Sequence, residues 1–338
     1  MKKKLMLLVI AAFVLASFTA CSEKKEENDK IRIVTTIFPE YDWVREVVKG
    51  REQDLDITFL MGKGADLHSF QPSVSDIAKI SKCDLFIYVG GESEEWVEKV
   101  LKQAENKDMK VIDLMEVLGD DAKAEEVVEG MQDEDEHDHD HDHEDGEEGH
   151  DHHHEGGEIE YDEHVWLSLR NAQKIVKAIE AEIEKLDPAG ADTYKKNTNA
   201  YVEKLNALDT EYKSAVAAGT KKTVLFGDRF PFRYLVDDYD LKYYAAFVGC
   251  SAETEASFET IAFLAGKVDE LGLHTILTIE GRDHKIADTV AKTAKKVSDI
   301  SVATMNSMQG TTETDAKNGA TYYSIMHSNL EVLRKALQ

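Results

Sequence analysis

Short apolar segments alternate with amphipathic segments along most of this chain, and this alternation restricts the possible folds more than any other feature. The apolar segments form two sets of four, namely residues 31–36, 56–61, 84–90 and 110–114, then 223–226, 243–248, 275–279 and 302–305. Apolar runs of this length, separated by amphipathic helical patterns, are typical of βα units around a parallel sheet. We therefore expect an α/β fold with two (β/α)4-type lobes, each built on a parallel sheet.

A longer helical pattern separates the two sets. Apolar side chains recur at steps of three and four between residues 189 and 217, and an Asp-Pro pair precedes them as a helix start. One helix here would span roughly 40 Å at 1.5 Å per residue and could join two lobes; two shorter helices broken near residues 197–199 are the alternative. We expect an N-terminal lobe over residues 31–188, a linking helix over 189–217 and a C-terminal lobe over 218–338. A chain of 338 residues is long enough for each lobe to bury its own core.

Residues 1–20 have the pattern of a secretory signal peptide, with a basic start, an apolar run and small residues near the end. The string from Ser17 to Cys21 resembles the lipobox of bacterial lipoproteins, in which the cysteine after the cleavage site carries a diacylglyceryl group. This resemblance implies that Cys21 is the lipid attachment site, and residues 21–30 are expected to form a polar tether. We expect an exported protein that is lipid-anchored at the outer face of a bacterial cytoplasmic membrane.

The charge and the cysteines exclude several classes of protein. The net charge of −27, from 40 basic and 67 acidic residues, disfavours nucleic acid and anionic membrane surfaces as partners and is compatible with collecting cations. Only Cys83 and Cys250 remain after Cys21, which is too few for a disulfide framework. Whether these two pair stays open at this point. Cys83 stands in an apolar context and is expected to be a buried thiol rather than a metal ligand.

One segment departs from the alternation. Residues 133–155 hold eight of the thirteen histidines, interleaved with Asp, Glu and Gly: His137, His139, His141, His143, His150, His152, His153 and His154. The segment has no apolar residue for a core, so we expect a disordered loop within the first lobe. Such a charge run can simply stay solvated, but alternating Asp and His also offers many weak, exchangeable metal sites, and we favour this capture role. Imidazole-rich sites prefer zinc, copper or nickel to manganese, so the tract favours zinc.

Two further histidines stand where a parallel sheet places its ligands. His68 follows the predicted strand 56–61 after a glycine-containing turn, and His164 stands between the histidine-rich tract and a helical pattern that starts near residue 167. In open α/β sheets, ligands bind at the carboxyl ends of the strands. Either histidine alone would most often be an ordinary surface residue, so the hypothesis of a metal site depends on the two together.

Longer strings around these histidines resemble a known family. Residues 64–73, Gly-Ala-Asp-Leu-His-Ser-Phe-Gln-Pro-Ser, resemble the first ligand motif of the zinc and manganese receptors of ABC importers, the cluster A-I or high-affinity zinc uptake family. Residues 162–167, Asp-Glu-His-Val-Trp-Leu, resemble the second ligand motif, and residues 89–96 and 320–330 resemble a further landmark and the closing helix. The resemblance implies two α/β lobes joined by one long helix, a divalent ion held in the cleft, and an ABC transporter permease with its ATPase as partners.

Two ligand positions of that family do not carry over to this chain. The third motif of the family falls on Gly227, which has no side chain to offer. The fourth falls on Asn306, whose amide oxygen is a weaker donor for zinc than a carboxylate. Other donors from the second lobe are therefore needed.

The candidate donors that follow predicted strands of the second lobe are Asp228, Glu280 and His284. The expected ligands are therefore His68, His164 and His284, with Asp228 or Glu280 as the oxygen donor. Three imidazoles and one carboxylate form an ordinary tetrahedral set for zinc. The alternatives are that Asp228 pairs with a nearby arginine, that Glu280 orients an imidazole, and that His284 is a surface residue at the start of a helix.

These observations predict a monomeric extracellular receptor that carries a divalent transition-metal ion. Zn2+ is the expected transported ligand, and a manganese (Mn2+) or iron receptor of the same family is the alternative. A secreted metallo-hydrolase is disfavoured, because the sequence has no His-Glu-x-x-His helix, nucleophile elbow, phosphate loop or dinucleotide fingerprint. A surface adhesin or a zinc reservoir without transport is a further alternative. We therefore expect a binding protein and not an enzyme.

Overall fold

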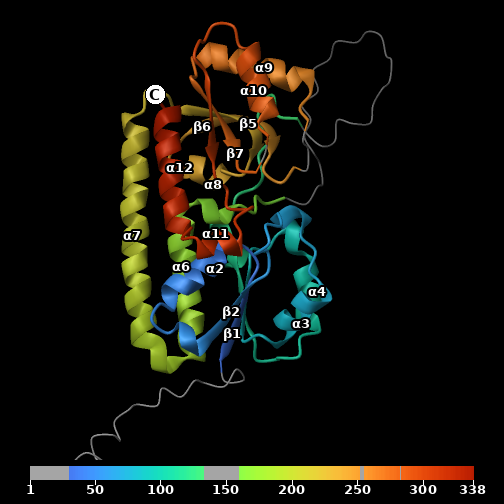
Figure 1. Cartoon of the computed structure of the whole chain (residues 1–338), viewed down its shortest axis with the longest axis vertical. Coiled ribbons are helices and arrows are strands. Elements are labelled where there is room, and N and C mark those ends of the chain that lie inside the picture. The colour runs from blue at the N-terminus through green and yellow to red at the C-terminus, as the bar shows by residue number, and fades with distance from the viewer. Residues whose placement is uncertain (1–29, 133–159, 252–254, 282) are drawn as a thin grey trace, which may run out of the picture.

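The computed structural model describes residues 30–132, 160–251, 255–281 and 283–338. The signal peptide, Cys21 with its tether up to residue 29, and the histidine-rich tract over residues 133–155 lie outside the described residues. Two lobes lie one above the other along the long axis of the molecule, and one long helix runs beside both (Figure 1). Within the described ranges, no helix combines the length and the apolar character needed to cross a membrane.

The N-terminal lobe is built on a parallel sheet with the strand order β2-β1-β3-β4. Its strands are β1 (Ile31–Thr35), β2 (Leu55–Phe59), β3 (Leu85–Tyr88) and β4 (Lys110–Asp113). Its helices are α2 (Phe38–Val47), α3 (Val74–Lys82), α4 (Trp96–Lys102), α5 (Leu114–Leu118) and α6 (Leu169–Leu186). Successive side chains of a strand point to opposite faces, so Ile33 packs with α2, α5 and α6 while Val34 packs with α3 and α4. Both faces of the sheet are therefore covered by helices.

The C-terminal lobe repeats this plan with the strand order β6-β5-β7-β8. Its strands are β5 (Thr223–Phe230), β6 (Lys242–Val248), β7 (Thr275–Ile279) and β8 (Ser301–Met305). Its helices are α8 (Arg233–Asp238), α9 (Phe258–Leu271), α10 (Lys285–Thr293), α11 (Glu313–Lys317) and α12 (Tyr322–Ala336). Leu225 packs with α9 and α10, whereas its neighbour Phe226 packs with α8 and α12. The predicted fold class, two α/β lobes with parallel sheets, is confirmed.

Short 3-10 helices complete the chain. They are η3 (Glu52–Asp54), η4 (Leu67–Ser69), η5 (Glu92–Glu94), η6 (Gly119–Asp121), η8 (Val165–Leu167) and η9 (Pro188–Gly190). Three of them, η4, η5 and η8, carry or support the histidines discussed below.

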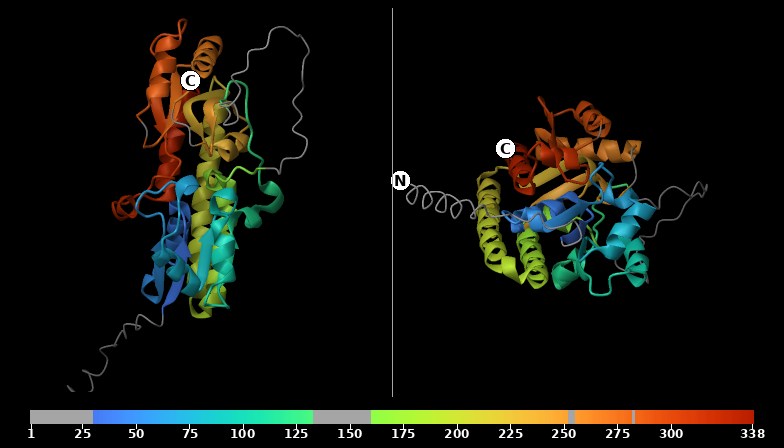
Figure 2. Two further views of the ribbon diagram at one scale, coloured as in Figure 1. Left: turned by 90° about the vertical axis from the view of Figure 1, so that its right-hand side faces the viewer. Right: turned by 60° about the horizontal axis from the view of Figure 1, so that its bottom comes forward.

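The linking helix is α7 (Ala191–Ala218), which is continuous over 28 residues. The alternative of a break near residues 197–199 is wrong, because Thr198 is buried inside an unbroken helix. Helix α7 packs against α2 and α6 of the N-terminal lobe and against α12, which lies beside its upper half (Figure 1, Figure 2). It therefore contacts both lobes, as a helix of this length predicts.

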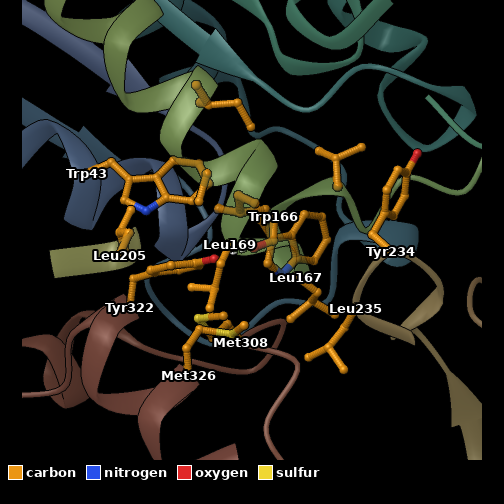
Figure 3. Close-up of a cluster of buried hydrophobic side chains, with 14 of the residues drawn as sticks. Trp43, Trp166, Leu167, Leu169, Leu205, Tyr234, Leu235, Met308, Tyr322 and Met326 are labelled. Carbon is orange, nitrogen blue, oxygen red and sulfur yellow. Dashed lines mark hydrogen bonds between the residues drawn. The ribbon is translucent and has the colours of Figure 1, made fainter. Parts of the chain in front are cut away.

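The largest buried core is shared by the two lobes, although each lobe also buries a smaller cluster of its own on one face of its sheet. One cluster of buried side chains extends from Ile33 to Leu337 and includes residues of both lobes. At its centre the ring of Trp43 packs edge-on against Tyr322 at 5.0 Å, and the Tyr322 hydroxyl donates to the carbonyl of Trp166 at 2.7 Å (Figure 3). The Trp166 indole in turn donates to the carbonyl of Ser307 at 2.8 Å. The lobes are thus joined by packed side chains as well as by α7.

Candidate metal centre

His68 lies in η4, in the loop that follows β2. Asp66 is the N-cap of this short helix, and its Oδ1 accepts a hydrogen bond from the His68 backbone N–H at 3.1 Å. The ring is fixed on its other side, because Nδ1 lies 2.8 Å from the Ser93 hydroxyl and 3.4 Å from Glu163 Oε2. The Nε2 atom of His68 is therefore the one that faces away from these partners.

His164 is fully buried at the start of η8. Asp162 Oδ1 accepts from its backbone N–H at 2.8 Å and lies 3.0 Å from its Nδ1. The imidazole also packs against the ring of Trp166, with centroids 5.2 Å apart, so the shared core supports it from behind. Like His68, it keeps Nδ1 against an acceptor and presents Nε2.

The two Nε2 atoms face each other at 3.2 Å. A carboxylate beside Nδ1 holds the ring proton there, which leaves a lone pair on Nε2. Two nitrogens at 2.0 to 2.1 Å from a tetrahedral zinc ion lie roughly 3.3 Å from each other, so the observed spacing fits one shared ion. The structure brings together the two histidines whose motifs pointed to a metal site.

Negative charge surrounds this pair. Burial works against ionisation of Glu163, but hydrogen bonds from His68 and Ser93 hold its pKa below the ordinary value. Burial likewise opposes ionisation of Asp66, and the hydrogen bond and charge of Arg229 hold its pKa below the ordinary value. Charged carboxylates beside the imidazoles favour a bound cation.

Gln309, in the loop after β8, reaches the imidazole pair from the C-terminal lobe. Its Nε2 lies 2.5 Å from His164 Nε2 and 3.3 Å from His68 Nε2, so the amide donates to both rings. Gln309 also lines a cavity of about 560 Å³ between the lobes, to which neither imidazole contributes. Gln309 therefore contacts both this cavity and the two imidazoles.

Arg229 connects the segments around the site. Its side chain is only 7% exposed. Nη2 donates to Asp66 Oδ2 at 2.9 Å and to Gln309 Oε1 at 3.4 Å, while Nη1 donates to the carbonyl of Ser251 at 3.2 Å. One guanidinium therefore joins the His68 loop, the Gln309 loop and the loop after β6.

Cys250, in the loop after β6, is the third side chain at this place with an atom that could bind a metal ion. One ligand atom from each of His68, His164 and Cys250 lies within 4.8 Å of the other two. Burial raises the pKa of the Cys250 thiol, and the charges of nearby carboxylates, Glu125 first, raise it further.

Cys250 and Cys83 are both free thiols, so the two cysteines do not pair. Cys83 is fully buried, as predicted, at the carboxyl end of α3.

The other predicted donors lie elsewhere. Among the described residues, Asp228, Glu280 and His284 are not part of the group formed by the two imidazoles and Cys250. Asp228 accepts from the backbone N–H groups of Arg229 and Ile279. Glu280 accepts from the backbone N–H and hydroxyl of Ser307 at 2.6 and 2.8 Å, and so shapes the loop that carries Gln309. His284 stands at the start of α10 with a left-handed backbone, φ 56°.

The third ligand position of the family is closed by packing. Strand β5 shifts its register against β6 between Phe226 and Arg229, so Gly227 lies in a β-bulge. A Cβ atom on Gly227 would stand 2.5 Å from the Ala287 Cα, on the backbone of α10. No side chain fits there unless α10 moves. Asn306 is also engaged locally, since its Oδ1 accepts from the Met308 N–H at 2.7 Å.

Three residues of the site were missed by sequence reasoning: Cys250, Gln309 and Arg229. Cys250 stands two residues after the strand predicted over residues 243–248, so the rule that selected His68, a donor at a strand end, would also have selected it. Gln309 and Arg229 carry no comparable signal, because glutamine and arginine are common on any surface.

Comparison with known proteins identifies the family. The model of the family "zinc-uptake complex component A, periplasmic" matches residues 33–336. This chain belongs to that family. The resemblance inferred from the motifs around His68 and His164 is thereby confirmed.

Individual relatives agree with this assignment. The zinc-binding lipoprotein AdcA of Streptococcus pneumoniae serotype 4 is 33% identical over 332 residues, which cover 97% of this chain and 60% of AdcA. The high-affinity zinc uptake system protein ZnuA of Bacillus subtilis is 32% identical over 339 residues, which cover 98% of this chain and 97% of ZnuA. The Zn(II)-bound ZnuA-like domain of Streptococcus pneumoniae AdcA superimposes with a TM-score of 0.67 at 29% identity, covering 91% of this chain and 99% of that domain.

The chain therefore spans 60% of the length of AdcA but nearly all of Bacillus subtilis ZnuA. These relatives are named for zinc binding and zinc uptake rather than for a reaction. Family membership thus supports a binding protein over the metallo-hydrolase considered from the sequence.

Proposed function

We propose that this protein captures one zinc ion between its lobes, with His68 and His164 as ligands, and delivers it to an ABC importer. The observation that carries the proposal is the pair of Nε2 atoms 3.2 Å apart, each on a ring whose Nδ1 faces a carboxylate. The Gln309 amide donates to both lone pairs in this structure, and a cation bound there would replace the amide as their common partner. Zinc at its usual distance from imidazole nitrogen fits this place.

Zinc is favoured over manganese and iron by the chemistry of the donors. Imidazole nitrogen suits zinc, whereas manganese prefers carboxylate, carbonyl and water oxygens. The names of AdcA and ZnuA, which share about a third of their residues with this chain, point the same way. We therefore assign zinc as the transported ligand, with a manganese or iron receptor as the alternative that the metal-binding experiment addresses.

Export and delivery extend the proposal beyond the described residues. A lipid on Cys21 would keep the receptor at the outer face of the cytoplasmic membrane, beside the permease and its ATPase. The histidine-rich tract over residues 133–155 would raise the local zinc concentration through weak sites. AdcA is named a lipoprotein and ZnuA part of a zinc uptake system, and these names support both steps.

Zinc competition against a strong chelator tests the site. We expect His68→Ala and His164→Ala each to weaken zinc binding by at least about 100-fold, since even a partner that only orients a ligand contributes 10- to 100-fold. His274→Ala and His327→Ala are matched controls, because both side chains are exposed and outside the imidazole pair. Unchanged zinc affinity in either ligand variant would contradict the site.

Zinc uptake by cells that lack the gene tests delivery. Wild-type protein should restore growth in zinc-depleted medium, whereas His164→Ala should not. Restoration by both proteins would separate the cleft site from transport, whereas restoration by neither would favour a surface role without delivery.

A further inference from the structure

The geometry points to Cys250 as the third ligand, so that zinc is held by two imidazole nitrogens and one thiolate sulfur. This inference rests on the proposed zinc site of His68 and His164 and specifies which donor the C-terminal lobe supplies. It also defines the substrate class, because a thiolate selects zinc and similarly soft ions over manganese, magnesium and calcium.

The position of the sulfur is the first argument. The ligand atoms of His68, His164 and Cys250 all lie within 4.8 Å of one another, and they come from both lobes. In a tetrahedral zinc site with Zn–N near 2.05 Å and Zn–S near 2.3 Å, nitrogen and sulfur lie roughly 3.6 Å apart. A shift of about an ångström brings the three atoms to these distances.

The close approach of the chain to His164 is the second argument. A Cβ atom on Gly249 would stand 3.1 Å from His164 Nδ1 and 2.9 Å from its Cε1, and the second distance is shorter than Cβ atoms tolerate. Glycine at this position therefore lets the loop pass against the imidazole and brings the following residue, Cys250, to the site.

The fixation of this loop is the third argument. The carbonyl of Ser251, the residue after Cys250, accepts from Arg229 Nη1 at 3.2 Å. The same guanidinium holds Asp66, the N-cap of the helix that carries His68, at 2.9 Å. One buried side chain thus fixes two of the three proposed ligand segments relative to each other.

Binding requires a simple exchange at the sulfur. The Zn–S bond replaces the S–H bond, the thiol proton leaves to water, and no oxidant or reductant takes part. The ligand set carries a single negative charge, and the neutral imidazoles keep their protons on Nδ1 toward Asp162 and Glu163.

Cobalt(II), added to the full chain, tests the assignment, because a thiolate ligand gives a sulfur-to-cobalt charge-transfer band in the near ultraviolet. We expect the band in the parent protein and in Cys83→Ser, the matched control with a buried thiol outside the site. Cys250→Ser should lose the band and weaken zinc binding by at least about 100-fold. Cys250→His should recover zinc binding through nitrogen without recovering the band.

A measurement on the unaltered protein guards against misfolded variants. Saturating zinc should protect Cys250 from alkylation, read by peptide mass mapping. Persistence of the cobalt band in Cys250→Ser, equal alkylation with and without zinc, or loss of cobalt binding in His284→Ala but not in Cys250→Ser would each overturn the assignment. If these results accompany normal loss of binding in His68→Ala, the two-histidine site stands and only Cys250 is excluded. If the parent protein binds neither zinc nor cobalt, both the proposed function and the assignment of Cys250 fail.

Discussion

Arg229 Nη2 donates to Asp66 Oδ2 at 2.9 Å, and this ion pair joins the C-terminal lobe to the loop that carries His68. The β-bulge at Gly227 places Arg229 at the carboxyl end of β5, where it also reaches Gln309 and the carbonyl of Ser251. The pair is more than a surface contact, because the arginine side chain is 7% exposed and the aspartate side chain 31%. It holds the two sides of the site at one fixed spacing.

We predict that Arg229→Gln lowers the free energy of unfolding by about 1 to 3 kcal/mol, because buried acceptors lose a charged donor. Zinc affinity should fall as well, since the His68 loop and the loop after β6 lose their common anchor. Urea unfolding and chelator competition measure the two effects. Glu98→Gln, which breaks the exposed pair with Lys102, is the control and should leave stability almost unchanged. An equally small effect of Arg229→Gln would contradict the anchoring role.

Gln309→Ala should tighten zinc binding by roughly tenfold, on the basis of about 1 kcal/mol for each hydrogen bond that the metal displaces. The Gln309 amide nitrogen donates to both Nε2 lone pairs, and these are the lone pairs that zinc needs. Oε1 of this amide accepts a hydrogen bond from Arg229. If the amide rotated by 180° to offer Oε1 to the ion, its NH2 group would face the Arg229 donor, so rotation gains little. The amide must therefore withdraw when the ion binds.

Isothermal titration with zinc measures this change. Gln173→Ala is the matched control, because that amide donates to a backbone carbonyl within α6. Weaker zinc binding in Gln309→Ala would show instead that Gln309 supplies an oxygen ligand to the ion.

The buried carboxyl of Glu94 should make stability depend on pH. Burial raises its pKa from 4.5 to about 8, although the backbone N–H groups of Val89 and Gly90 oppose the shift. Between these pH values the folded protein keeps a proton that the unfolded chain releases, so stability falls as the pH rises and levels off above about 8. The stability lost across this range is on the order of a few kcal/mol.

Glu94→Gln should reduce this pH dependence, because the amide cannot ionise and can still accept from the same backbone groups. Part of the slope should remain, because burial also raises the pKa of the neighbouring Glu40 carboxyl. Urea unfolding of parent and variant at several pH values across the range measures the difference. Glu98→Gln, at a fully exposed position, should leave the slope of the parent unchanged. Equal slopes in the parent and in Glu94→Gln would show that another group titrates.

The fold was predictable because its signals are local and repeated. Strands such as Thr275–Ile279 agree with the predicted range, and α7 differs from its predicted range by two residues at its start and one at its end. The shared core was not predictable. Chain length suggests a core for each lobe, and each lobe does bury a small cluster of its own. The largest cluster joins both lobes through contacts such as that of Trp43 with Tyr322, two residues that are far apart in the sequence. Contacts between residues far apart in the sequence produce no periodic pattern from which they could be predicted.

The site was predictable only in part, for a physical reason. His68 and His164 stand in strings with a recognisable order, and the structure places their Nε2 atoms in contact. The donor from the C-terminal lobe depends on how closely two backbones approach, which composition does not report. Gly227 is closed off by α10, while Gly249 opens a path past His164 for the next residue. His284 was chosen for its residue type and its strand-end position, yet among the described residues it does not join the two imidazoles and Cys250.

Gly249→Ala offers a test of that close approach. The new methyl carbon would stand 2.9 Å from both His164 Cε1 and the Phe230 carbonyl oxygen, so the loop after β6 must move away from the imidazole. We predict about a tenfold loss of zinc affinity, because the displaced loop carries Cys250 out of reach and pushes on a ligand ring. Gly266→Ala is the matched control: it lies exposed inside α9 with nothing within 4 Å of a new Cβ, and it should stabilise the fold by roughly 0.5 to 1 kcal/mol without changing zinc affinity. Chelator competition and thermal unfolding of both variants measure these outcomes. Unchanged zinc affinity in a folded Gly249→Ala protein would mean that the approach of this loop to His164 does not matter for the ion.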